Sequence, residues 1–82
     1  MAEVRWTPQA VEDLESITDF IAKDSPQYAR FFVVDILHAA DRLEKFPSSG
    51  RVVPELNDSI IREIILGNYR LVYRIHQNVV EL

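Results

Sequence analysis

The 82-residue sequence predicts a single α+β domain, in which an antiparallel sheet carries a hairpin of two helices on one face. Two stretches indicate this class. Alternating apolar residues on both sides of Gly67-Asn68 are typical of a β-hairpin, because a tight turn needs a backbone angle that these residues tolerate. Two runs with apolar residues at helical spacing are joined only by Asp24-Ser25-Pro26, which makes the helices antiparallel. The expected order of elements is β-α-α-β-β-β.

Composition and charge narrow the range of functions. The chain is 48% hydrophobic and 27% charged, as in ordinary folded domains, and its net charge is −4. Residues 1–50 hold five basic against nine acidic side chains, whereas residues 51–82 hold four of each. This balance argues against binding nucleic acid through bulk charge, although it allows a local basic patch.

The residue types also indicate a compartment. Cysteine is absent, so we expect neither a disulfide framework nor a thiolate metal site, which suits a reducing cytoplasm. No apolar run approaches the roughly 20 residues of a membrane span, and the N-terminus has no signal-peptide pattern. We therefore expect a cytoplasmic protein without a membrane partner.

Local signals define the first strand and helix. Ala2, Val4 and Trp6 alternate with charged residues and predict a short strand. Thr7-Pro8 begins a helix, since threonine can cap a helix and proline is preorganised for its first turn. The apolar stripe of this helix is Ala10, Leu14, Ile17 and Ile21.

The second helix is expected from about Pro26 to Lys45, where Phe46-Pro47 ends it. Its apolar stripe is Ala29, Phe32, Val33, Ile36, Leu37, Ala40 and Leu43. At 100° per residue Phe31 points nearly opposite this stripe, with Val34 on its flank. Chance exposure and packing beneath a C-terminal segment or a partner are both compatible with this position.

The predicted hairpin has two different faces, because successive strand residues alternate. In its second strand Tyr69, Leu71, Tyr73 and Ile75 point one way, whereas Arg70, Val72, Arg74 and His76 point the other way. A two-residue turn sets Arg62 opposite Tyr73 on the apolar side, where we expect it to be partly buried and paired. The same register places Ile61 and Ile65 among the arginines. A turn one residue longer would instead direct Glu63 inward.

A second tight turn at Gln77-Asn78 begins the last strand, which stops at Leu82 after four residues. We therefore expect one domain over residues 1–82 with a shortened last strand. Such a strand should leave a sheet edge available for strand addition by a partner.

The sequence contains little catalytic signal. We find no glycine-rich phosphate loop, His-Glu-x-x-His motif or Cys/His cluster, and we expect neither a cofactor nor a metal site. Arg70, Arg74 and His76 share one face, where arginines could hold phosphate and histidine could transfer protons. A solvated face, whose arginine stems cover Ile61 and Ile65, explains the same residues and is favoured by spacing alone.

Several segments together form an ordered set that runs across essentially the whole chain. They are Trp6-Thr7-Pro8, Asp24-Ser25-Pro26, Phe46-Pro47-Ser48-Ser49-Gly50-Arg51, Val52-Val53-Pro54-Glu55-Leu56 and Gly67-Asn68-Tyr69-Arg70-Leu71-Val72-Tyr73. The set resembles the RelE/ParE superfamily of toxins from type II toxin–antitoxin systems. The later segments are more similar to the ParE-like, plasmid stabilization branch than to RelE. The resemblance implies the fold predicted above and a complex with a cognate antitoxin. It also implies that the toxin assembles either as a homodimer or as a heterotetramer with the antitoxin.

The resemblance implies one of two activities. ParE-type members inhibit DNA gyrase by binding, whereas RelE-type members cleave mRNA on the ribosome. The acidic balance favours the ParE-like toxin, and a RelE-like endoribonuclease or an inactive truncated relative that still binds antitoxin are the alternatives. A nuclease would use Arg70, Arg74 and His76. The expected partner-binding residues are Phe31, Val34, Ile61, Ile65, Arg62, Tyr69, Arg70 and Arg74.

Overall fold

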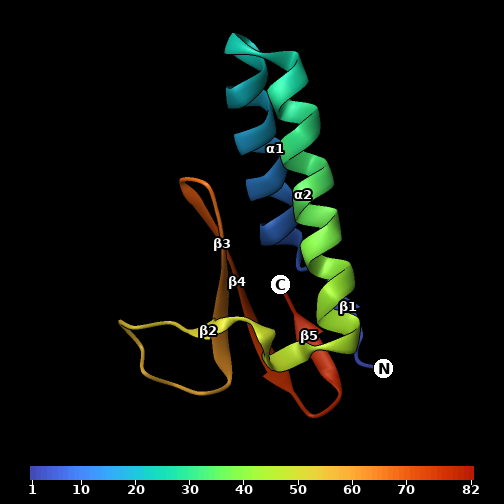
Figure 1. Cartoon of the computed structure of the whole chain (residues 1–82), viewed down its shortest axis with the longest axis vertical. Coiled ribbons are helices and arrows are strands. Elements are labelled where there is room, and N and C mark those ends of the chain that lie inside the picture. The colour runs from blue at the N-terminus through green and yellow to red at the C-terminus, as the bar shows by residue number, and fades with distance from the viewer.

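The computed structural model describes residues 1–82 and has the predicted α+β class, with two helices packed on a five-stranded sheet (Figure 1). Its elements are β1 (Glu3–Arg5), α1 (Pro8–Asp24), α2 (Pro26–Lys45), the 3₁₀ helix η1 (Pro47–Ser49), β2 (Arg51–Val52), β3 (Ile61–Leu66), β4 (Tyr69–His76) and β5 (Val79–Glu81). Neither helix is long and apolar enough to cross a membrane.

The strand order across the sheet is β1-β5-β4-β3-β2. Strands β2, β3, β4 and β5 pair antiparallel along this order, whereas β1 pairs parallel with β5, so the sheet is mixed. The outer strands of the sheet are β1 and β2, and the last strand, β5, lies between β1 and β4. Within the described chain β5 pairs with Arg74, Ile75 and His76 of β4.

Side-chain caps begin both helices as predicted. The Thr7 hydroxyl accepts a hydrogen bond from the Ala10 N–H at 3.1 Å, and the Ser25 hydroxyl accepts one from the Tyr28 N–H at 3.1 Å. The Ser25 N–H also donates to the Ile21 carbonyl at 2.9 Å. One residue therefore ends α1 and starts α2, which leaves no linker and makes the helices a tight hairpin.

The β3–β4 turn has the predicted two-residue length and register. Arg62 pairs with Tyr73 and Leu66 with Tyr69, as expected. Gly67 has a φ of 62°, in the left-handed region that a residue without a side chain adopts most easily. The turn fixes which residues face the helices and which face away.

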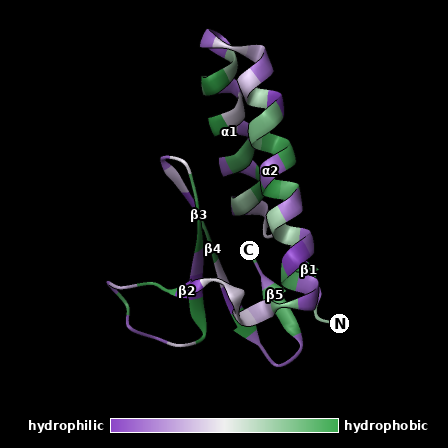
Figure 2. Ribbon diagram, viewed as in Figure 1, coloured by the Kyte–Doolittle hydropathy of each residue, from purple (hydrophilic) through white to green (hydrophobic).

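The hydrophobic core joins α2 to the middle of the sheet. Its buried residues are Ala2, Ala39, Ala40, Leu43, Leu71, Tyr73, Val80 and Leu82. In contrast, α1 contains no buried residue, although its apolar stripe is clear in the sequence. Figure 1 shows the helical hairpin extending well beyond the sheet, and Figure 2 shows hydrophobic residues along the length of both helices. The apolar face of α1 is thus incompletely covered.

A buried tyrosine fixes the corner where β2 begins. The Tyr73 hydroxyl donates to the Pro47 carbonyl at 2.7 Å and accepts from the Gly50 N–H at 3.0 Å. A Cβ atom on Gly50 would lie 2.6 Å from the Tyr73 hydroxyl and 2.7 Å from the Glu63 carbonyl oxygen. Glycine is therefore required there by close approach, and this contact sets the position of Arg51 beside β3.

Candidate functional site

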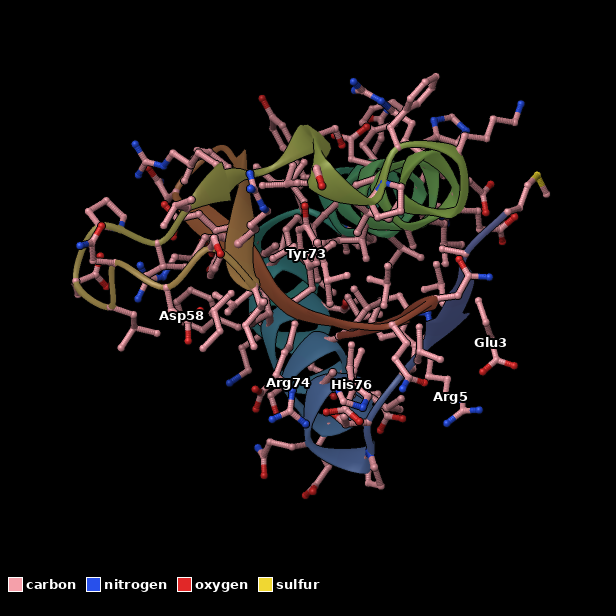
Figure 3. The ribbon with its side chains drawn as sticks, turned by 90° about the horizontal axis from the view of Figure 1, so that it is seen from below. Glu3, Arg5, Asp58, Tyr73, Arg74 and His76 are labelled. Carbon is pink, nitrogen blue, oxygen red and sulfur yellow. The ribbon has the colours of Figure 1, made fainter.

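The open face of the sheet, defined as the side away from α2, carries the three residues predicted for a nuclease. Arg70, Arg74 and His76 occupy alternate positions of β4 and are exposed. Figure 3 shows Arg74 and His76 projecting from this face, whereas Tyr73 lies on the other side. The structure therefore brings these residues onto one face.

A buried carboxylate lies between two of the arginines. The Glu63 side chain has no exposed surface, and its two oxygens accept hydrogen bonds from Arg51 Nε at 2.6 Å and Arg70 Nη1 at 2.9 Å. A buried carboxylate is stable only when it is paired, and the two guanidinium groups provide this pairing. From the sequence, Glu63 is expected to turn inward only with a turn one residue longer. In the structure it faces the open side, opposite Val72, and its arginine partners cover it.

Arg70 is also held from the solvent side. Its Nη1 donates to Glu55 at 2.9 Å, and Glu55 lies in the loop between β2 and β3. The hydrogen bond from Arg70 lowers the pKa of Glu55 below its usual value. The pKa of Arg70 is raised above its usual value, mainly by its hydrogen bond to Glu55 and next by its hydrogen bond to Glu63. The Arg70 guanidinium is therefore fixed in position and fully ionised.

Each arginine of the open face has a carboxylate partner. The pairs are Arg5 with Glu3, Arg51 with Glu63, Arg70 with Glu55 and Glu63, and Arg74 with Glu81, the last at 3.2 Å. Figure 3 shows Glu3 and Arg5 on the same side as Arg74. The face is thus charge-compensated, and it offers phosphate groups no cluster of unpaired arginines.

Arg62 lies on the opposite face and is tied to backbone carbonyls. Its Nε donates to Ser59 at 3.0 Å, and its Nη1 donates to Gly50 at 3.0 Å and to Ser48 at 3.3 Å. The side chain is half-buried, so the prediction of a partly buried, paired arginine is confirmed. Its bonds join the start of β2 to the residues before β3.

An apolar groove of about 290 Å³ separates the helical hairpin from β4. Its apolar lining comes from both helices, from β4 and from the ends of the chain: Trp6, Ala10, Leu14, Ile17, Phe32, Ile36, Tyr69, Leu71, Val72 and Leu82. The rings of Phe32 and Tyr69 meet at one end, with centroids 5.3 Å apart. Sequence patterns did not predict this groove, because it depends on how α1 is placed relative to β4.

The outward position predicted for Phe31 is confirmed. Its side chain is 56% exposed and lines a second groove together with Tyr28, Ile65 and Tyr69. Val34 is exposed as well, and Ile61 is half-buried on the open face. The expected partner-binding residues therefore do not form one surface. Phe31 and Val34 lie on α2, Arg62 and Tyr69 lie on the face of the sheet toward the helices, and the open face carries Ile61, Ile65, Arg70 and Arg74.

Together these features define a small α+β protein with a charge-compensated open face and an apolar groove beside the helices. Residues 4–82 match the family model described as the ParE toxin of the type II toxin–antitoxin system, parDE. The chain is similar to Toxin RelE2 of Caulobacter vibrioides, with 36% identity over 66 residues that cover 80% of this chain and 70% of that protein. It is also similar to the protein named "Putative toxin Y4kP" of Sinorhizobium fredii, with 38% identity over 78 residues that cover 93% and 78%. The chain therefore belongs to the ParE toxin family of type II toxin–antitoxin systems.

Proposed function

We propose that this toxin acts by binding a target protein such as DNA gyrase, and that a cognate antitoxin neutralises it. The observation that supports binding over RNA cleavage is the pairing of the open-face arginines, because Arg51, Arg70 and Arg74 each already bond a carboxylate. The proposal places the toxin in the cytoplasm, where gyrase acts. It also includes assembly as a homodimer or as a heterotetramer with the antitoxin.

The chemistry of RNA cleavage supports the same choice. Cleavage needs a proton acceptor for the attacking 2′-hydroxyl and a donor for the leaving oxygen. Histidine is the side-chain type suited to proton transfer, and His76 is the histidine of the open face, whereas arginine side chains remain protonated and are poor bases. A binding toxin needs only a surface, and Ile65 and Val72 give the open face exposed apolar area beside its charges.

A second candidate, a RelE-like ribosome-dependent endoribonuclease, is favoured by one observation. Arg70, Arg74 and His76 lie on one exposed face, and a relative carries the name Toxin RelE2. For such an activity Glu55 and Glu81 would have to release their arginines when RNA binds.

A supercoiling assay with purified gyrase and relaxed plasmid tests the binding proposal. We expect the toxin to inhibit supercoiling, and we expect inhibition to be lost when the toxin is first mixed with the protein encoded in the adjacent reading frame. Full supercoiling at a large molar excess of folded toxin would contradict a gyrase target. Circular dichroism of the same sample provides the control for folding.

A further inference from the structure

A polar pocket of about 300 Å³ lies where the end of α2 meets β3. It is separate from the apolar groove, with which it shares no lining residue. Three segments of the chain supply its polar side chains: the last turn of α2 supplies Arg42, η1 supplies Ser49, and β2 supplies Arg51. Two guanidinium groups and a hydroxyl group therefore line one hollow.

Arg42 is available to a ligand. Its side chain is exposed, and it takes part in none of the ion pairs that the other arginines form with carboxylates. A guanidinium group has five N–H donors in a planar fork, which matches the oxygens of a phosphate or carboxylate group. Arg42 thus leaves a positive charge and several donors unused at the pocket.

Arg51 is held in place for the same ligand. Its Nε donates to the buried Glu63 carboxylate at 2.6 Å, and this bond leaves its two terminal amino groups unused. The backbone before it is also fixed, because the Gly50 N–H donates to the Tyr73 hydroxyl at 3.0 Å. A side chain that is already oriented loses little conformational entropy when it binds an anion.

The edge of β3 adds a backbone donor. The Ile75 N–H donates to the Ile60 carbonyl at 2.8 Å, and because antiparallel strands direct these bonds to alternate sides, the Ile65 N–H points away from β4. Strand β2 begins at Arg51, opposite Glu63, so Ile65 has no strand partner on that side. Ile65 lines the pocket, and its N–H therefore joins the side-chain donors there.

Charge and size indicate the class of ligand. Glu63 is the acidic residue of the pocket, and Arg51 and Arg70 compensate it, so Arg42 leaves the pocket positive. A phosphate monoester has three terminal oxygens and about two negative charges, and it also carries an organic group that the apolar wall of Ile64 and Ile65 could contact. A nucleic-acid strand needs a longer track of cations, which a chain of net charge −4 does not provide.

We propose that this pocket is a binding site for the phosphate group of a small phosphate monoester. Arg42 and Arg51 hold the phosphate oxygens from two sides, and the Ser49 hydroxyl and the Ile65 N–H complete the set of donors. Glu63 does not touch the ligand; it orients Arg51. The inference does not depend on the target proposed above, because the site lies at the end of α2 and needs neither gyrase nor an antitoxin.

The test is an NMR titration of the isotope-labelled 82-residue chain at constant ionic strength. The probes are inorganic phosphate, adenosine 5′-monophosphate, adenosine, and an RNA tetranucleotide without terminal phosphates. Inorganic phosphate and the monophosphate share the proposed group, whereas adenosine lacks it and the RNA carries only diesters. We expect the first two to shift the amides of Ser49, Arg51 and Ile65 to saturation. The monophosphate should bind at least as tightly as inorganic phosphate, and adenosine and the RNA should bind at least about tenfold more weakly.

Arg42→Met should weaken binding of the monophosphate at least about tenfold, because hydrogen bonds between charged groups are lost. Arg30→Met is the matched control: it removes the same charge from an exposed position of α2 about 18 Å away along the helix, and it should leave affinity unchanged within about twofold. Ser49→Ala should weaken binding about fivefold through the loss of one hydrogen bond. Circular dichroism checks that each variant is folded.

Three results would each overturn the inference. The first is the absence of saturable shifts at Ser49, Arg51 and Ile65 with both phosphate probes. The second is equal affinity of the Arg42→Met and Arg30→Met variants for the monophosphate, which would reduce the effect to net charge. The third is binding of adenosine or of the RNA as tight as that of the monophosphate, which would show that the pocket does not select a phosphate monoester.

Discussion

Glu63 and Arg70 form an ion pair that joins a fully buried carboxylate to the exposed face of the sheet. The Arg70 Nη1 lies 2.9 Å from a Glu63 oxygen, and the exposed fractions of the two side chains are 46% and 0%. The same Glu63 carboxylate holds Arg51, so a single buried charge positions two surface arginines. Removing one arginine leaves the carboxylate with half its partners, and burial makes that loss costly.

Arg70→Met should lower the melting temperature more than Arg74→Met does. Both residues are on β4, point to the same face and form one or more ion pairs, but the Arg74 partner, Glu81, is exposed. Exposed pairs contribute little, whereas loss of a partner for a buried carboxylate is strongly destabilising, so we expect roughly twice the decrease for Arg70→Met. Equal decreases in calorimetric melting temperature would show that Glu63 does not depend on Arg70.

Gly50→Ala should destabilise the fold by steric overlap. The new Cβ would meet the Tyr73 hydroxyl at 2.6 Å and the Glu63 carbonyl at 2.7 Å, and overpacking of this kind costs about 1–3 kcal/mol. Gly67→Ala is the control, since its Cβ meets no atom within 4 Å and its cost of about 1–2 kcal/mol comes from the positive φ alone. Urea unfolding measures both changes. A Gly50→Ala variant as stable as the wild type would refute the close approach.

Stability should fall at alkaline pH because of Tyr73. Burial raises the pKa of Tyr73 above its ordinary value of 10.0, against the lowering effects of the Gly50 hydrogen bond and of Arg62. A raised pKa in the folded state means that the unfolded chain loses this proton first, so the stabilisation is complete below pH 10 and is lost as pH rises toward the folded pKa. Urea unfolding between pH 8 and pH 12 should show this loss in wild type and a smaller one in Tyr73→Phe. Parallel pH profiles for the two proteins would exclude Tyr73 as the source.

Shortening an apolar side chain of α1 to alanine should destabilise the fold less than the same change in α2. Ile17 lies on the groove and is half-buried, so Ile17→Ala should cost about 1 kcal/mol or less of the free energy of unfolding. Leu43 has no exposed surface and lies in the core, so Leu43→Ala should cost about 2–5 kcal/mol. Similar losses for both variants would mean that the groove is closed in solution.

The local elements were predictable because their signals are carried by adjacent residues. The Thr7 and Ser25 caps and the two-residue turn at Gly67-Asn68 follow from short-range geometry. The parallel pairing of β1 with β5 was not predictable in this way, because the alternation of apolar residues identifies a strand but not the strand with which it pairs.

The candidate site was less predictable for a related reason. Glu63 is buried only because Arg51 from β2 and Arg70 from β4 close over it, and these residues come together only in the folded sheet. Strand alternation correctly predicted that Arg70, Arg74 and His76 share one face of β4. It did not predict the carboxylate partners of the two arginines. The groove likewise depends on the distance between α1 and β4, which no local pattern specifies.

The most direct measurement of the central claim, that this toxin acts by binding and does not cleave RNA, is an RNA cleavage assay. Purified toxin is incubated with mRNA, with and without translating ribosomes, beside a His76→Ala variant. Because the arginines of the open face are paired and His76 alone is suited to proton transfer there, we predict intact mRNA in every reaction. Cleavage that requires ribosomes and disappears with His76→Ala would contradict the claim and establish the endoribonuclease alternative.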